Sequence, residues 1–378
     1  MFATTWDRIA ALRMERQHLI ERAPARRMLP VVKDLVAVQS QVMSSAELSL
    51  NARLDGLRRD DVRKALWTNR TLVKTWAMRG TLHLVAADEL PELAAALGNR
   101  TAYLKPLWLR YFGVTAKQMQ RLQDGIGAIL SDRPMTRTAL AEALAAELGD
   151  PTFADKVTGS WGTFLKPAAN RGLLCFGPDD GRNVTFVKPA DWLGIDIPEP
   201  DGSAIATVTE RHLAAFPGAS KPELARWWGM TPGWLKTPLA ELGDRLTLVD
   251  VEGTKAYVRT SDLGALAETE PRPGTLRMLG GFDPYTLSLQ KEAEPLLPMA
   301  RRPLVSRTAG WISAVVLDGG RVIGTWTHEA GPKRVSIEIA PWRKITRAER
   351  GQLDDEAARI ATFLEPGAQA AVTYAAAA

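Results

Sequence analysis

Two glutamines separated by a single residue are the side chains whose type and spacing point most directly to chemistry. Gln39 and Gln41 flank Ser40 and follow an apolar run at residues 35–38. In extended backbone, residues i and i+2 share a face, whereas in a helix they diverge by about 200°. If the preceding helix ends near residue 38, both amides point the same way, and each offers a donor pair and an acceptor. On spacing alone, a polar turn that ends a helix is the preferred interpretation.

Most other catalytic signatures are missing from the sequence. The single cysteine, Cys175, excludes a disulfide framework, a thiolate zinc site and a four-thiolate iron–sulfur cluster. There is no phosphate-binding glycine loop and no Gly-x-Ser-x-Gly nucleophile turn. Asp283 is the best carboxylate candidate for a site, although a turn formed with Pro284 is the preferred interpretation. Four histidines are too widely spaced for a metal site: His18, His83, His212 and His328. We therefore expect no metal and no cofactor.

The charge distribution favours a polyanionic partner. The 378 residues carry 48 basic and 43 acidic side chains, and residues 1–110 alone hold 18 basic and 11 acidic ones. A positive N-terminal third suits nucleic acid, and an arginine-rich, solvated surface is the alternative interpretation. No apolar stretch approaches the ~20 residues of a membrane span, and the first residues lack a signal-peptide core. These features predict a cytoplasmic protein with no membrane partner.

The elements around the glutamines suggest a winged helix, which is a helical unit closed by a β-hairpin. Apolar periodicity predicts an amphipathic helix near the start of the chain and a second helix over 28–38. A short helix over 60–67 is followed by two strand-like runs, 72–76 and 81–85. Helices followed by a hairpin make the winged-helix pattern.

The same pattern recurs twice further along the chain. Helices over 136–148 and 158–170 precede a hairpin that ends near residue 187, and a third copy begins at Ser220. Residues 261–274 read as a linker, and the hairpin signal Asp318-Gly319-Gly320 and a closing helix over 347–364 follow. The sequence thus predicts an α+β chain with winged-helix units at 1–110, 111–200 and 201–265 and a strand-rich region at 275–378.

Four motifs, in order along nearly the whole chain, resemble one family. The context of Gln39 and Gln41 resembles the paired-glutamine motif of the AlkZ-like DNA glycosylases, in the AlkZ/YcaQ superfamily of tandem winged-helix proteins. Residues 78–84, 281–285 and 320–326 look like the family's later signatures. The YcaQ branch has aspartate where Gln41 stands, so the sequence sides with the AlkZ branch. Ser40 stands where that motif usually has an apolar residue.

This resemblance implies a monofunctional DNA glycosylase of base excision repair, in general repair or in self-resistance. Its expected substrate is double-stranded DNA carrying N7-alkylguanine, including bulky adducts and interstrand crosslinks. Gln39 and Gln41 are the expected catalytic residues and position a water. The expected scaffold is C-shaped, monomeric and free of cofactors, with a β-hairpin that probes a groove, at Arg79 or around Gly319-Gly320-Arg321.

The residues expected to bind DNA are Arg79, His83, Arg301, Arg302, Arg307 and Arg321. A buried strand histidine is the alternative for His83, and solvated charges are the alternative for Arg301, Arg302 and Arg307. A non-enzymatic winged-helix DNA-binding protein or transcriptional regulator is the competing function. The two glutamines and the lack of an obvious dimerisation helix speak against it.

Overall fold

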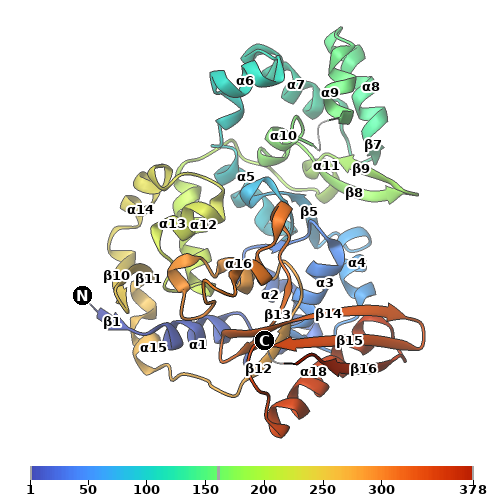
Figure 1. The fold of residues 1–378 in the computed structure, drawn as a ribbon. Helices are drawn as coiled ribbons and strands as arrows, with labels where there is room; N and C mark the ends of the chain where they lie inside the picture. Colours follow the sequence, from blue (N-terminus) through green and yellow to red (C-terminus); the bar gives the residue numbers. More distant parts are fainter. Residues whose placement is uncertain (1, 160–161, 377–378) are drawn as a thin grey trace. The chain divides into compact units, whose positions relative to one another are not determined.

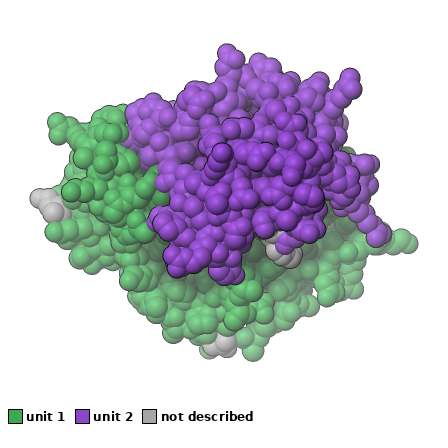
Figure 2. Space-filling view, turned by 90° about the horizontal axis from the view of Figure 1, so that it is seen from above, with its two compact units in different colours: residues 1–62, 209–378 green, residues 63–208 purple. Residues whose placement is uncertain are grey.

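The computed structural model describes residues 2–159 and 162–376, which form two compact units. Unit 1 consists of residues 1–62 and 209–378, and unit 2 of residues 63–208 (Figure 2). The chain passes from one unit to the other within helices α4 (Arg59–Trp67) and α12 (Ser203–Ala215). The structure is 49% helical and 22% strand, so the expected α+β class is confirmed. The division into four successive domains stays a prediction.

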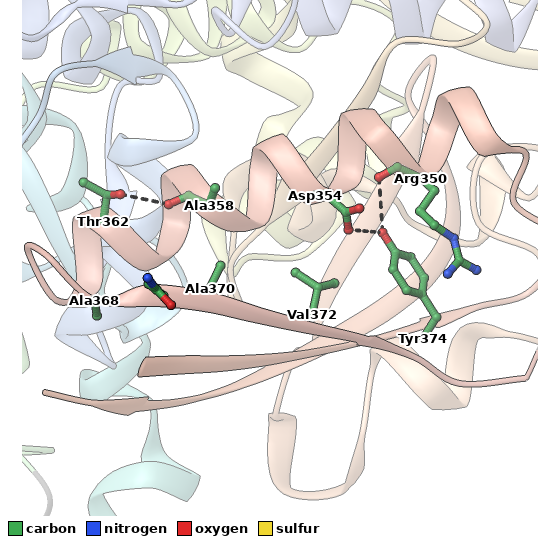
Figure 3. Close-up of a pocket in the computed structure, with 9 residues that line it drawn as sticks. Arg350, Asp354, Ala358, Thr362, Ala368, Ala370, Val372 and Tyr374 are labelled. Carbon is green, nitrogen blue, oxygen red and sulfur yellow. Dashed lines mark hydrogen bonds between the residues drawn. The ribbon is translucent and has the colours of Figure 1, made fainter. Parts of the chain in front are cut away.

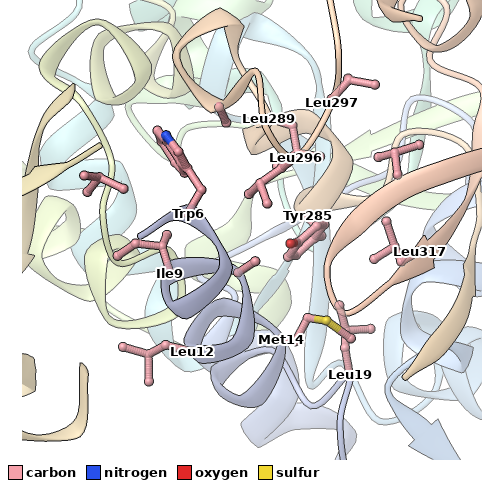
Figure 4. Close-up of a cluster of buried hydrophobic side chains, with 14 of the residues drawn as sticks. Trp6, Ile9, Leu12, Met14, Leu19, Tyr285, Leu289, Leu296, Leu297 and Leu317 are labelled. Atoms are coloured by element: carbon pink, nitrogen blue, oxygen red, sulfur yellow. The ribbon is translucent and has the colours of Figure 1, made fainter. Parts of the chain in front are cut away.

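Helix α1 (Trp6–Arg16) organises the core of unit 1. Its N-terminus is capped by Thr5, whose hydroxyl accepts a hydrogen bond from the Arg8 amide at 3.3 Å. One face of the helix enters a large apolar cluster with side chains from far along the chain (Figure 4). The members drawn there include Trp6, Ile9, Leu12, Met14, Leu19, Tyr285, Leu289, Leu296, Leu297 and Leu317. The predicted first helix is therefore confirmed, and it joins the two halves of unit 1.

The next elements along the chain contain the two glutamines. Helix α2 (Met28–Asp34) is followed by the short strand β3 (Val38–Gln39) and helix α3 (Met43–Asn51). The predicted extension of the second helix to residue 38 is wrong, because Val36 adopts a φ of 66°. A β-branched residue in this region is strained and cannot continue a right-handed helix.

Unit 2 has two hairpins and a helical cluster. Strands β5 (Leu72–Trp76) and β6 (Leu82–Ala86) pair antiparallel, and β7 (Met135–Thr136), β9 (Asn183–Val187) and β8 (Cys175–Asp180) form a second sheet in that order. Its helices are α5 (Leu90–Leu97), α6 (Pro106–Phe112), α7 (Ala116–Ile129), α8 (Arg137–Leu148), α9 (Thr152–Gly159), α10 (Lys166–Asn170) and α11 (Pro189–Leu193).

The helix predicted over 158–170 is not continuous. Helix α9 ends at Gly159 and α10 begins at Lys166, while residues 160 and 161 of the predicted helix lie outside the described residues. Gly162 has a φ of 79°, and a Cβ there would lie 2.4 Å from the Trp76 ring. The backbone at Gly162 is left-handed and packs directly against the Trp76 ring of β5, so it cannot form the expected helical turn.

The third copy of the predicted pattern lies in unit 1. Helix α13 (Lys221–Trp228) begins with a reciprocal capping box between Ser220 and Glu223, which confirms the predicted start. Helix α14 (Lys236–Leu242) and the antiparallel strands β10 (Leu246–Val251) and β11 (Thr254–Arg259) follow, and β1 (Phe2–Thr4) pairs parallel to β10. The predicted linker at 261–274 is wrong in part, because Leu263–Glu268 forms helix α15 with Leu266 fully buried.

The C-terminal part is a five-stranded sheet covered by one helix (Figure 1). Its order is β12 (Leu276–Leu279), β13 (Ala314–Asp318), β14 (Arg321–Gly331), β15 (Arg334–Pro341) and β16 (Gln369–Tyr374). Helix α18 (Arg347–Leu364) packs on this sheet and has the predicted bounds. Short helices α16 (Pro284–Ser288) and α17 (Arg302–Val305) lie in the long connection from β12 to β13.

A fully buried ion pair ties the α3 region to this C-terminal part. Both side chains of Arg53 and Asp283 have no exposed surface, and two guanidinium nitrogens donate to the two carboxylate oxygens at 2.7 and 2.8 Å. Arg53 also donates to the Ser49 carbonyl, and Asp283 accepts from the Tyr285 amide at the start of α16. Asp283 is therefore a structural carboxylate in a turn, as the preferred interpretation of its sequence context has it.

Removing one partner of this pair should destabilise the fold strongly. Asp283→Ala would leave the Arg53 charge buried without its counter-ion, which costs about 3–5 kcal/mol of unfolding free energy. The control is Asp7→Ala, which removes an exposed pair with Arg321 and should cost ~1 kcal/mol or less. Chemical denaturation of the three proteins measures both values, and equal losses for the two variants would contradict this assignment.

Candidate active site

The glutamines lie in the short segment between helices α2 and α3. Gln39 ends β3 and is 6% exposed, Ser40 is fully buried, and Gln41 is exposed just before α3. Val42, the N-cap residue of α3, is also extended, with φ −114° and ψ 111°. The segment is therefore extended at Gln39 and bends at Gln41 and Val42. A common direction of the two amides stays a prediction.

The first turn of α3 fixes this segment against the connection after β12. The Ser45 and Ala46 amides donate to the Val42 carbonyl. A Cβ on Gly281 would lie 3.7 Å from the Ser45 hydroxyl and 2.8 Å from the Ile312 carbonyl. A Cβ on Gly280 would lie 2.8 Å from the Leu48 side chain on α3. The motif predicted at 281–285 is therefore next to the start of the helix that follows the glutamines.

The carboxylates on and beside α3 are already engaged. Glu47 is buried and accepts from Arg59 at 2.8 Å, and Asp283 is held by Arg53. Across the part of the chain that the structure describes, no cluster of three or more acidic, histidine or cysteine side chains is arranged to hold a metal ion. The groups this segment offers for chemistry are therefore the neutral amides of Gln39 and Gln41.

Arg79 and His83 belong to the β5–β6 hairpin of unit 2. Arg79 lies in the turn with a φ of 57°, and His83 lies on β6, 2% exposed. The His83 Nδ1 is 3.0 Å from the Thr81 carbonyl. Burial, then the charge of Arg79, lowers the pKa of His83 from 6.5 to about 3, with a smaller contribution from Arg100. His83 is therefore neutral at pH 7, and its contact with DNA stays a prediction.

Three of the predicted DNA-binding arginines lie between β12 and β13 in unit 1. Arg302 donates to the carbonyls of Leu289 and Gln290 at 2.7 Å, so its guanidinium braces the surrounding loop. Arg301 lies over the Trp342 ring, 5.7 Å from its centroid. Arg307 is exposed, and its side chain has no ion-pair partner in the described ranges. Contact of all three with DNA stays a prediction.

The hairpin turn at Gly319-Gly320 does not project from the unit. A Cβ on Gly320 would lie 2.5 Å from the Tyr285 hydroxyl and 2.7 Å from Ala10 on α1. Arg321 is paired with Asp7 at 2.7 Å and donates to the Pro295 carbonyl. The expectation that this turn probes a DNA groove is therefore corrected, because the turn is packed inside unit 1. DNA contact by Arg321 stays a prediction.

Sequence reasoning missed the longer hairpin formed by β14 and β15. These strands stay paired up to Gly331 and Arg334, and the turn between them carries exposed Lys333 and Arg334 (Figure 1). The available signal was the Gly331-Pro332 turn pair between two strand-forming runs, followed by two basic residues.

A groove of about 630 Å³ lies between α18 and β16 (Figure 3). Tyr374 donates to Asp354 at 2.7 Å there, and the Arg350 guanidinium lies 4.2 Å from the centroid of the Tyr374 ring. The rest of its lining is mainly small side chains and Thr362. None of the predicted site residues lines this groove.

The sequence matches the family of AlkZ-like DNA glycosylases over residues 32–363. The chain belongs to this family, and it is a DNA glycosylase. It is 39% identical over 374 residues to the interstrand DNA cross-link repair glycosylase of Streptomyces sahachiroi, which covers 94% of this chain and 96% of the relative. Its fold is similar to the solved structure of Streptomyces sahachiroi DNA glycosylase AlkZ, with a TM-score of 0.87, 35% identity, and coverage of 98% and 100%. The non-enzymatic alternative is thereby set aside. No helix in the described ranges is both long and apolar enough to cross a membrane.

The low pKa of His83 predicts a pH-dependent stability. Between about pH 3 and about pH 6.5, His83 is protonated in the unfolded chain and neutral in the folded chain. The stabilisation is complete above pH 6.5 and is lost as pH falls toward 3. His83→Gln should reduce the slope of unfolding free energy against pH by up to about 1.4 kcal/mol per pH unit in this window. Denaturant titrations at a series of pH values test this, and an unchanged slope would contradict the assignment.

Proposed function

We propose that this glycosylase hydrolyses the N-glycosidic bond of N7-alkylguanine in duplex DNA, with Gln39 and Gln41 positioning the attacking water. The observation that carries the proposal is the Gln39-Ser40-Gln41 segment between the end of β3 and the start of α3, whose neighbouring carboxylates are engaged in ion pairs. The name of the Streptomyces sahachiroi relative, which refers to interstrand DNA cross-links, supports a substrate range that extends to bulky adducts and crosslinks.

The chemistry of the lesion explains why neutral amides suffice. Alkylation at N7 makes the base cationic, so the base leaves without protonation by a strong general acid. What remains is to hold a water near C1′ and to stabilise a sugar that develops oxocarbenium character. The carbonyl oxygen of each glutamine accepts a hydrogen bond from that water, while the amide nitrogens orient the side chains. No lysine stands out as a Schiff-base nucleophile, so the proposed reaction is hydrolysis alone.

The repeated helix–hairpin order supports a tandem winged-helix scaffold, which the proposal takes to act as a monomer. The hairpin β5–β6 follows α4, β8–β9 follows α10, and β10–β11 follows α14. For entry into a groove we favour the β14–β15 turn, because it is exposed and basic whereas the Gly319-Gly320 turn is packed. Arg307 and Arg79 are the further phosphate contacts in this proposal. Arg301, Arg302, Arg321 and His83 remain in it as secondary contacts.

Removal of either amide should abolish most excision. Single-turnover release of N7-methylguanine from a labelled duplex should fall by about 10²–10³-fold in Gln39→Ala and Gln41→Ala, since the water loses its orientation. Duplex affinity should stay within about twofold, because phosphate contacts dominate binding.

Ser40→Ala is the matched control for this experiment. The Ser40 hydroxyl is buried without a hydrogen-bond partner among the residues the structure describes, so its loss should leave the rate nearly unchanged. A Gln41→Ala variant that releases the base at the wild-type rate would refute the proposed role of the amides.

The basic turn of the β14–β15 hairpin should contribute phosphate contacts. The double variant Lys333→Gln/Arg334→Gln should weaken duplex binding and lower the slope of log affinity against log salt concentration by about 2. Lys344→Gln/Arg347→Gln, which removes two exposed charges elsewhere in unit 1, serves as the control. Salt titrations followed by fluorescence anisotropy measure the slopes. Equal slopes for the two double variants would count against this hairpin as a groove contact.

A further inference from the structure

An exposed aromatic side chain lies on a segment that meets the first turn of α3, the helix that follows the glutamines. Trp311, just before β13, is 48% exposed, although tryptophan is usually among the more buried residues. Its ring meets that of Phe282 edge to face, with centroids 5.1 Å apart and planes at 79°. Phe282 itself is 7% exposed. The pair is thus a supported platform, with one ring held in the protein and the other presented to solvent.

The placement of this platform is fixed by the contacts of Gly281. A Cβ on Gly281 would lie 2.8 Å from the Ile312 carbonyl and 3.7 Å from the Ser45 hydroxyl, so both groups lie on the same side of this glycine. Ile312 directly follows Trp311, and Ser45 hydrogen-bonds back to Val42, the residue after Gln41. Trp311 and Gln41 therefore belong to two segments of unit 1 that meet at Gly281.

The backbone that presents the two rings is strained at two non-glycine residues. Phe282 has a φ of 59° and Ala309 a φ of 58°. Such conformations cost about 1–3 kcal/mol each and cluster at ligand-binding and catalytic sites. Strain on both segments of the platform is difficult to explain if Trp311 is merely an exposed surface residue.

The charge of the surrounding segment suits DNA. Residues 299–313 contain three arginines and no acidic residue. Arg307, which is exposed, lies four residues before Trp311. A cationic segment with a presented aromatic ring is the combination by which proteins hold a nucleotide, with phosphate bound by charge and a planar ring by stacking.

We propose that Trp311, supported by Phe282, stacks on a planar aromatic ring of the damaged nucleotide site and so positions the lesion before Gln39 and Gln41. This inference rests on the proposed function of the glutamines. The stacked ring is either a nucleobase at the lesion or an aryl group of the adduct, and both present the same flat surface. Trp311 is then a substrate-binding residue that sets which adducts are processed well.

The test compares two lesions that differ by one ring. Duplexes containing N7-methylguanine or N7-benzylguanine are processed by wild type, Trp311→Ala, Trp311→Phe and Leu248→Ala under single-turnover conditions. Leu248→Ala is the control, since it removes a 40% exposed apolar side chain from β10 of the same unit. Trp311→Ala should raise the half-saturating protein concentration about tenfold, the loss of one stacking contact. Trp311→Phe should restore most of it.

The two substrates identify the ring. A similar loss on both lesions means that Trp311 stacks on a nucleobase, and a loss confined to the benzyl lesion means that it stacks on the adduct. Either result supports the proposal. Values for Trp311→Ala within twofold of Leu248→Ala on both lesions overturn it.

A binding measurement keeps this test separate from the role of the glutamines. A duplex with 2-aminopurine beside a stable abasic analogue reports stacking through fluorescence quenching, and it needs no catalysis. Quenching that depends on Trp311 supports the platform even if Gln39→Ala and Gln41→Ala remain active. Quenching that is the same in wild type and Trp311→Ala, together with no specific loss for Trp311→Ala on the benzyl lesion, overturns the platform even if the glutamines prove catalytic.

Discussion

The buried pair of Arg53 and Asp283 is the constraint on which the site depends. Arg53 follows α3, and Asp283 lies in the connection after β12, far along the chain. Two charge-assisted hydrogen bonds, shielded from solvent, hold these two segments together. Two desolvated charges are stable only when each satisfies the other, so their mutual position is set within a narrow range. Asp283 directly follows the Gly281-Phe282 turn that rests on α3. The glutamine segment and the aromatic platform thus share one anchor.

Ion pairs such as this one also engage the carboxylates near the glutamines. The carboxylates that would act as general bases in many hydrolases are used here for structure, with Asp283 held by Arg53 and Glu47 by Arg59. In the proposed reaction, a cationic leaving group lowers the demand on the enzyme, so oriented amides take the place of a charged base. Within unit 2, His83 of the β5–β6 hairpin is neutral, so the positive charge at that turn comes from Arg79.

Local signals in the sequence were sufficient for elements whose boundaries are set by local chemistry. The capping box at Ser220 and the terminal helix over 347–364 were predicted because caps and periodicity act within one or two turns. Predictions were wrong where residues far apart in the sequence pack together. The Gly319-Gly320 turn, which packs against Tyr285, is the example. The paired glutamines became site candidates through the family resemblance, since their spacing alone favoured a polar turn, and their role stays a prediction. Trp311 was not considered, because its exposure depends on tertiary placement.

The most direct test of amide catalysis is the single-turnover rate of N7-methylguanine release as a function of pH. Glutamine amides do not titrate, and the pKa of His83 lies near 3. The rate at saturating enzyme should therefore be flat between about pH 4 and about pH 8, where a carboxylate base with a pKa of about 4.3 or a histidine base with a pKa of about 6.5 would give a titration limb. A Gln41→Glu variant should acquire such a limb. A clear pKa in the wild-type profile would contradict hydrolysis by two neutral amides.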